Sequence, residues 1–222
     1  MLLNQMGRND KGNKVSIVQI TETLLSRYQK KFSGNHRFIV GIDGLGGAGK
    51  TTVAKELRHA LELSNHEAFI VHLDDHIVET HKRYGTGNDE WFEYYFLQWD
   101  IGLLETELFK KLQINQGSIT LPFYHSSTDT VKTKPIQLAS SAIILIEGVF
   151  LQRKEWQRYI DFMIYVDCSH ELRAERVLDR DSYLGDHQAR LDKYKRRYWL
   201  AEDYYVDEVD PLGSADYIYR GN

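Results

Sequence analysis

The stretch "GIDGLGGAGKTT", residues 41–52, decides the fold. Gly44, Gly49, Lys50 and Thr51 have the spacing G-x-x-x-x-G-K-[ST], which is typical of a phosphate-binding loop. Glycine lets successive backbone N–H groups point inward around phosphate oxygens, and the following helix adds its positive N-terminal end. An ordinary glycine-rich turn is the alternative. An apolar strand pattern before the loop and a helical pattern after it favour phosphate binding.

The motif assigns a role to each of its polar side chains. Lys50 is expected to reach the β- and γ-phosphates of a nucleotide, and the Thr51 hydroxyl is expected to bind Mg²⁺. The expected cofactors are therefore ATP and Mg²⁺. The residues expected to bind ATP are Gly44, Leu45, Gly46, Gly47, Ala48, Gly49, Lys50, Thr51 and Thr52.

The rest of the chain alternates short apolar runs with helical patterns. Strands are predicted at residues 38–42, 68–73, 142–146, 162–166 and 217–219. Helices are predicted at residues 15–28, 53–61, 91–112, 170–180 and 188–206, and a small ribbon at residues 119–124 and 131–138. Buried strands that alternate with helices indicate a parallel sheet with right-handed crossovers. The predicted architecture is α/β in three layers.

Composition limits the classes of protein that fit. The 222 residues, 42% of them hydrophobic, are enough for one sizeable core, so a single domain is expected. A net charge of -4 gives no basic surplus for nucleic acid or anionic lipid. With no run of eighteen apolar residues, no secretory signal pattern and a single cysteine, Cys168, a cytoplasmic protein is expected. The expected partner is a small-molecule substrate, and a homo-oligomer is left open.

Three carboxylates follow predicted strands. Asp74 and Asp75 come after the second strand, and Glu147 comes directly after residues 142–146. Ligands of open parallel sheets bind at the carboxyl ends of the strands, so these side chains are candidates for chemistry. Asp74 is interpreted as the base that accepts a proton from an attacking hydroxyl, and Glu147 as a holder of the water shell of the metal. The alternative for the aspartates is capping of the next turn.

Arginines are the candidate electrophilic groups. The segment 173–181 places Arg173, Arg176 and Arg180 on one side of a predicted helix. Arg176 and Arg180 are candidates to close over the nucleotide and spread the charge of the transition state. A solvated helix face with acidic neighbours is the alternative. Arg197, in a second basic segment, is also expected to face the cleft.

Two further patterns receive plainer interpretations. The spacing of His72, His76 and His81 matches no H-E-x-x-H metal site, so they are interpreted as pocket or surface histidines. The aromatic cluster at residues 91–99 is interpreted mainly as core, because packing is the commonest use of aromatic side chains at helical spacing. A share of the cluster is a candidate wall for a flat base or sugar.

The motifs GLGGAGKT, LDD, LPFYHSSTD, ILIEGVF, RVLDRD and PLGSADYIY occur in this order. In that order they resemble the uridine kinase branch of the P-loop kinases, which is related to pantothenate kinase and phosphoribulokinase. The resemblance covers about residues 38–219. It implies a three-layer P-loop NTPase fold: a parallel five-stranded sheet with helices on both faces and a mobile lid at about residues 180–190. The whole chain, 1–222, would then be one kinase domain, with residues 1–36 as an N-terminal extension that carries a packing helix.

The resemblance also implies roles for single residues. The catalytic aspartate of the family falls at Asp74 and the glutamate of its E-G element at Glu147. Tyr124 matches the tyrosine that contacts the nucleoside, while Arg176 and Arg180 fall among the lid arginines.

The departures from the family lie in the acceptor site and the lid. An aspartate-histidine-proline stretch of the family is replaced by "GTGNDEWFEYY", in which Asp89 aligns with the acid, and His125 replaces the acid of "PxYDF". The "ERG" of the family's lid is missing. The residues expected to bind the acceptor are Asp74, Asp89, Tyr124, His125 and Arg197.

The function hypothesis is an ATP- and Mg²⁺-dependent kinase that phosphorylates a hydroxyl of a small molecule, with a pyrimidine nucleoside such as uridine favoured. One alternative is a related kinase for another small alcohol, such as pantothenate, a sugar or a nicotinamide riboside. The other is a nucleotide-sensing ATPase or switch without an acceptor. A carboxylate base favours the kinase, since a switch has no evident use for it.

Overall fold

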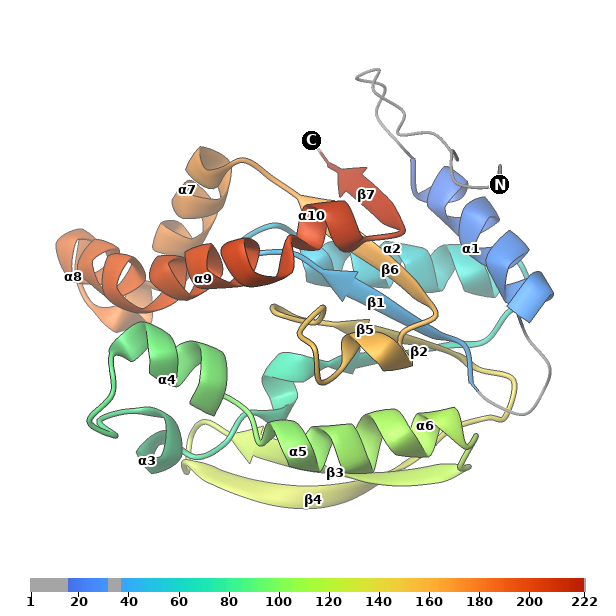
Figure 1. Cartoon of the computed structure of the whole chain (residues 1–222), viewed down its shortest axis with the longest axis horizontal. Coiled ribbons are helices and arrows are strands. Elements are labelled where there is room, and N and C mark those ends of the chain that lie inside the picture. Colours follow the sequence, from blue (N-terminus) through green and yellow to red (C-terminus); the bar gives the residue numbers. More distant parts are fainter. Residues whose placement is uncertain (1–15, 32–36, 222) are drawn as a thin grey trace.

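A five-stranded sheet lies at the centre of the computed structural model, which describes residues 16–31 and 37–221 (Figure 1). Its strands are β1 (Ile39–Asp43), β2 (Ala68–His72), β5 (Ile143–Glu147), β6 (Phe162–Asp167) and β7 (Tyr217–Arg220). They lie in the order β2-β5-β1-β6-β7, and every neighbouring pair is parallel. The predicted α/β fold with a parallel five-stranded sheet is confirmed.

The strands are buried on both faces because their sequences are apolar at consecutive positions. In β5, Ile143 and Leu145 pack into one core, whereas Ile144 and Ile146 pack into the other. All four side chains are fully buried. Each such side chain contributes about 1.5–3 kcal/mol through the area it removes from water.

Two helices cover the first face of the sheet. They are α1 (Ile17–Lys31) and α2 (Lys50–Leu63). Ile20 and Leu24 of α1 join Val53 and Leu57 of α2 in the core on this face. The packing helix predicted at residues 15–28 is present and runs from Ile17 to Lys31. Residues 1–15 and 32–36 lie outside the described residues.

The second face is covered by helices from the middle and the end of the chain. They are α4 (Glu90–Leu97), α5 (Ile101–Leu104), α6 (Lys111–Gln113) and α9 (Leu200–Val209). Figure 1 shows α5 and α6 on the same side as the antiparallel ribbon of β3 (Ser118–His125) and β4 (Thr130–Gln137). The predicted ribbon is thus confirmed. Tyr95 and Trp99 of the aromatic cluster lie in this core, as the pattern indicated.

The helix predicted over residues 91–112 is wrong in one respect, because the chain breaks it between Leu97 and Ile101. Asp100 leaves the helical region, with φ -77° and ψ 91°, and its Oδ1 accepts a hydrogen bond of 2.9 Å from the Leu103 amide. This side-chain cap starts a second helix, which continues from α5 through a π-helical segment (Glu105–Lys110) into α6. An aspartate in the middle of a periodic pattern was the missed signal.

The C-terminal third forms a nearly continuous helical layer. It consists of α7 (His170–Arg180), a 3₁₀ turn (Ser182–Leu184), α8 (His187–Lys193), a π-helical segment (Tyr194–Trp199), α9 and α10 (Pro211–Ser214). The helices predicted at residues 170–180 and 188–206 are therefore present. The expected lid, residues 180–190, corresponds to the turn between α7 and α8, where Tyr183 is 77% exposed. Its mobility stays a prediction.

The replacement of Gly148 by alanine is expected to lower the free energy of unfolding by about 1–3 kcal/mol, because overpacking forces neighbours to move. A Cβ at Gly148 would lie 2.8 Å from Cβ of Leu73, which is fully buried and cannot rotate away. Urea unfolding measures the change. Gly117→Ala is the control, since a Cβ there meets no atom within 4 Å. Equal losses in the two variants would contradict this packing.

Candidate active site

The glycine-rich loop joins β1 to α2 by a turn that few residues other than glycine can make. Gly49, with φ 98°, is the N-cap of α2, and Gly47 has φ 77°. A Cβ at Gly47 would also lie 2.8 Å from the carbonyl oxygen of Arg173. The turn brings the N-terminus of α2 to the loop, where its free amides and positive dipole end suit an anion.

Lys50 is the first residue of α2. Its Nζ donates a hydrogen bond of 3.0 Å to the carbonyl oxygen of Leu45, so the side chain folds back along the loop. This orientation keeps the ammonium group beside the amides that are expected to hold phosphate. The loop amides, the helix end and Lys50 together fit a triphosphate.

Thr51 and Glu147 provide the oxygen atoms of the candidate metal site. The Thr51 hydroxyl donates a hydrogen bond of 3.1 Å to Oε1 of Glu147, and Glu147 is 6% exposed at the end of β5. Hydroxyl and carboxylate oxygens suit Mg²⁺, which also keeps several waters and binds phosphate oxygens. Within residues 16–31 and 37–221, no group of three or more His, Cys, Asp or Glu side chains could hold an ion. A site completed by nucleotide and water fits this donor set.

Asp74 lies just beyond the end of β2, in a 3₁₀ turn (Leu73–His76). The carboxyl is open to solvent, yet the protein atoms packed around it raise its pKa. Lys50 and Arg180 lower this pKa, whereas Glu147 raises it. These influences bring the predicted base, the loop lysine, the metal carboxylate and a lid arginine into one electrostatic neighbourhood.

The two predicted lid arginines both lie close to this neighbourhood. Nη1 of Arg176 donates a hydrogen bond of 3.2 Å to the carbonyl oxygen of Gly47 in the loop. Arg180 forms two hydrogen bonds, of 2.6 and 3.1 Å, with the carboxylate of Asp181. Arg176 thus already touches the loop, while a contact of Arg180 with phosphate stays a prediction.

A buried ion pair that the sequence did not indicate holds the tip of the loop. The Gly46 amide donates a hydrogen bond of 2.6 Å to Oε1 of Glu202, and Nη1 of Arg173 donates to Oε2 of Glu202 at 2.8 Å. Arg173 also donates to the carbonyl oxygen of Gly46 at 3.2 Å. Helices α7 and α9 therefore clamp Gly46. Its amide is engaged by a protein carboxylate, so its predicted contact with phosphate remains a prediction.

A second buried carboxylate supports the loop from behind. Asp43, the last residue of β1, accepts a hydrogen bond of 3.0 Å from Nε2 of Gln152 and another from the Tyr205 hydroxyl. Burial raises the pKa of Asp43, and these donors oppose that effect. The strand end is thereby fixed to the C-terminal helical layer.

The expected acceptor half includes the tip of the β3–β4 ribbon. The Tyr124 hydroxyl donates a hydrogen bond of 3.0 Å to Oδ1 of Asp129, which also accepts from the amide and hydroxyl of Thr80 at 2.9 and 2.7 Å. These contacts join the ribbon to α3 (Thr80–Arg83). The guanidinium of Arg83, which sequence reasoning missed, lies 5.2 Å from the centre of the Tyr124 ring.

The other two expected acceptor residues differ in exposure. Asp89 is exposed in front of α4, and its side chain makes no capping hydrogen bond. His125 is half-buried at the end of β3, and its Nε2 is a buried atom without a hydrogen-bond partner in the described part of the chain. Their contacts with an acceptor stay predictions.

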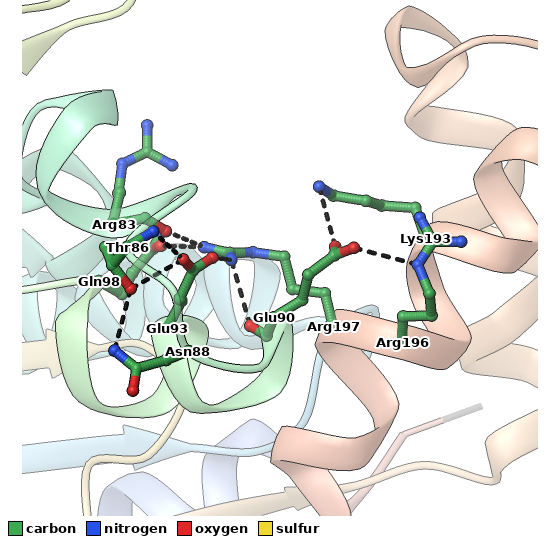
Figure 2. A network of polar contacts seen from close by, with 9 residues as sticks. All are labelled: Arg83, Thr86, Asn88, Glu90, Glu93, Gln98, Lys193, Arg196 and Arg197. Carbon is green, nitrogen blue, oxygen red and sulfur yellow. Dashed lines mark hydrogen bonds and ion pairs between the residues drawn. The ribbon is translucent and has the colours of Figure 1, made fainter.

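Arg197 is the centre of a buried polar network (Figure 2). Its side chain is fully buried and donates to Glu93 at 3.3 Å, to Gln98 at 3.3 Å and to the carbonyl oxygen of Arg83 at 3.1 Å. Glu93 in turn accepts from the amide and hydroxyl of Thr86 at 2.7 and 2.9 Å. Arg197 therefore does not lie open to the cleft as expected. It fixes the segment before α4, and direct contact with an acceptor would require this network to open.

Comparison with known proteins places this site in a family. The model of the phosphoribulokinase / uridine kinase family matches residues 39–211. A uridine kinase of Borrelia duttonii is 30% identical over 152 residues, which are 64% of this chain and 66% of the relative. The chain thus spans just under two thirds of that relative's length. A uridine kinase of Staphylococcus haemolyticus is 31% identical over 150 residues, 65% of this chain and 68% of the relative.

Solved structures agree in fold. The structure of a possible uridine kinase from Bacillus stearothermophilus is 40% identical, covers 91% of this chain and 96% of its own, and superposes with a TM-score of 0.76. D-glycerate 3-kinase from Cryptococcus neoformans is 13% identical with a TM-score of 0.59, covering 83% of this chain and 88% of its own, and shares the fold alone.

Among the described residues, no helix combines the length and the apolar character needed to span a bilayer.

The predicted resemblance to P-loop kinases of the uridine kinase branch is confirmed, and the expected enzyme class, a phosphotransferase with an alcohol as acceptor, agrees with it. The chain belongs to the phosphoribulokinase / uridine kinase family.

Proposed function

We propose that this protein transfers the γ-phosphate of ATP to a hydroxyl of a pyrimidine nucleoside, with uridine as the first candidate. The names of the relatives support the acceptor class. The observation that carries the proposal is the position of Asp74 in the turn directly after β2, whose last residue is paired with Glu147 of β5. The charges of Lys50, Arg180 and Glu147 also act on the pKa of Asp74. A carboxylate beside the site of the γ-phosphate has a use in transfer to an alcohol.

In this proposal each group of the site has one task. The loop amides and Lys50 bind the triphosphate, and Thr51 and Glu147 hold Mg²⁺, which neutralises phosphate charge when bound. Asp74 accepts the proton of the acceptor hydroxyl as its oxygen attacks. Arg176 and Arg180 stabilise the charge of the transition state.

The acceptor would enter between Asp74 and the tip of the ribbon. The hydroxyl of Tyr124 is fixed by Asp129, so its ring is held in one orientation against which a base can stack. The guanidinium of Arg83 lies beside that ring, and His125 is the next residue in the chain. Asp89 is the further residue expected to contact the acceptor. At Asp89 and His125 this part of the site differs from the family pattern. The identity of the acceptor is therefore the first property to test.

An acceptor screen tests the function. ADP release in the presence of ATP and Mg²⁺ is expected to depend on an added acceptor, and to be fastest with uridine or cytidine when nucleosides, pantothenate and simple sugars are compared. Lys50→Ala is the control, because it weakens nucleotide binding as well as turnover. Equal ADP release with and without every acceptor would contradict the proposal and favour an ATPase or switch.

Asp74→Asn is expected to preserve ATP binding and to lower kcat by about 10²–10⁴-fold, because the amide cannot accept the proton. Steady-state kinetics with the best acceptor and calorimetric titration with ATP measure the two effects. Asp75→Asn is the matched control, since Asp75 is the adjacent exposed carboxylate and is not assigned to the reaction. A kcat for Asp74→Asn within a few-fold of the wild-type value would refute the assignment of the base.

The pH profile of kcat/KM should reflect the raised pKa of Asp74. Only the ionised carboxylate accepts a proton, so activity is lost as the pH falls through this pKa, at a higher pH than for an ordinary aspartate with pKa 3.8. Asp75 is one of the charges that raise this pKa. Asp75→Asn should therefore move the acidic limb to lower pH. A limb that stays in place or moves upward would contradict this coupling.

A further inference from the structure

His72 contacts the candidate metal carboxylate and lies outside the sequence motifs quoted above. It is the last residue of β2, and the β2–β5 ladder pairs its Cα with that of Glu147. Paired residues of neighbouring parallel strands project to the same face of a sheet. Nδ1 of His72 lies 2.6 Å from Oε1 of Glu147, and because the carboxylate accepts, the imidazole donates through Nδ1.

Glu147 is thereby held by two donors on one oxygen. Oε1 accepts from His72 at 2.6 Å and from the Thr51 hydroxyl at 3.1 Å. Among residues 16–31 and 37–221, the hydrogen bonds of the Glu147 carboxylate both go to Oε1 and none goes to Oε2. The two donors fix the orientation of the carboxylate, and its second oxygen remains available to a metal-bound water.

The surroundings of His72 favour this positioning role. Glu147 is nearly fully buried, whereas the side chain of His72 is 33% exposed. The ring of His72 also borders a pocket of about 230 Å³ that Asp75, His76 and Phe123 help to line. Because a third of the His72 side chain is exposed, it is not enclosed in the core. Substitutions at position 72 are therefore expected to leave the fold intact.

We propose that His72 is a positioning residue that holds Glu147 in the orientation required for Mg²⁺ at the nucleotide site. The proposal rests on the proposed function, since it assumes that the loop binds a nucleotide with Mg²⁺. Residues that orient metal-binding groups typically contribute 10–100-fold to metal affinity or activity. In this role His72 acts through Glu147, its hydrogen-bond partner.

The experiment compares the affinity for ADP with Mg²⁺ and with EDTA, by calorimetric titration, in wild type and variants. The wild-type protein should bind ADP more tightly with Mg²⁺. In His72→Leu and His72→Ala this gain should fall by about 10–100-fold, while ADP binding in EDTA stays within about two-fold. The free Mg²⁺ concentration for half-maximal activity should rise by a similar factor.

Two further variants separate positioning from packing. His72→Asn places an amide N–H close to the position of Nδ1, so it should restore most of the Mg²⁺-dependent gain. Phe123→Leu alters the wall of the same pocket without contact to Glu147 and should leave that gain unchanged. Thermal unfolding of each variant controls for loss of fold.

The outcomes distinguish the two proposals. If wild-type protein shows no Mg²⁺-dependent ADP binding, the proposed function fails and this inference fails with it. If the wild type shows the gain and His72→Leu and His72→Ala retain it, only the role of His72 is refuted. A larger gain in these variants would also refute it, because His72 would then compete with the metal for Glu147. Failure of His72→Asn to exceed His72→Leu would indicate packing and would overturn the role.

Discussion

The parallel register of three neighbouring strands is the constraint on which the site depends. Glu147 at the end of β5 is paired with Ile42 of β1 on one side and with His72 of β2 on the other. Because side chains alternate between the faces of a strand, a slip of one residue would turn Glu147 toward the opposite helices. The side chains of β5 pack into a separate hydrophobic core on each face of the sheet, and this packing holds the strand in its register. The packing of the core therefore also determines where the polar groups of the site lie.

The glycine-rich loop is held by the protein at both ends and at its tip. Asp43 fixes the strand before the loop, Glu202 and Arg173 hold Gly46, and α2 continues from Gly49. Burying these carboxylates is unfavourable by itself, and their hydrogen bonds offset that desolvation. A loop of glycines would lose much conformational entropy on binding a nucleotide if it were loose. The clamps order it in advance, which is the usual route to tight binding of phosphate.

The sequence predicted the parts of the molecule that local patterns encode. Apolar runs indicated the strands, and the spacing of glycines, Lys50 and Thr51 indicated the loop. The break at Asp100 was missed because the apolar periodicity continues across it. The pair of Gly46 with Glu202, 156 positions apart, and the burial of Arg197 depend on tertiary packing, for which a single sequence carries no local signal. The sequence indicated only a pocket or surface histidine at His72, because its pairing with Glu147 depends on the register of β2 and β5.

The central position of β1 has a consequence for how the chain matures as it is synthesised. The strand is made early, yet both of its neighbours in the sheet, β5 and β6, are encoded more than ninety residues later. Until β5 has been synthesised, the glycine-rich turn follows a strand that has no neighbouring strand to pair with. Contacts between segments so far apart in the chain make folding slow. The glycine-rich turn can therefore reach its final setting only after the chain has been made as far as β5, residues 143–147.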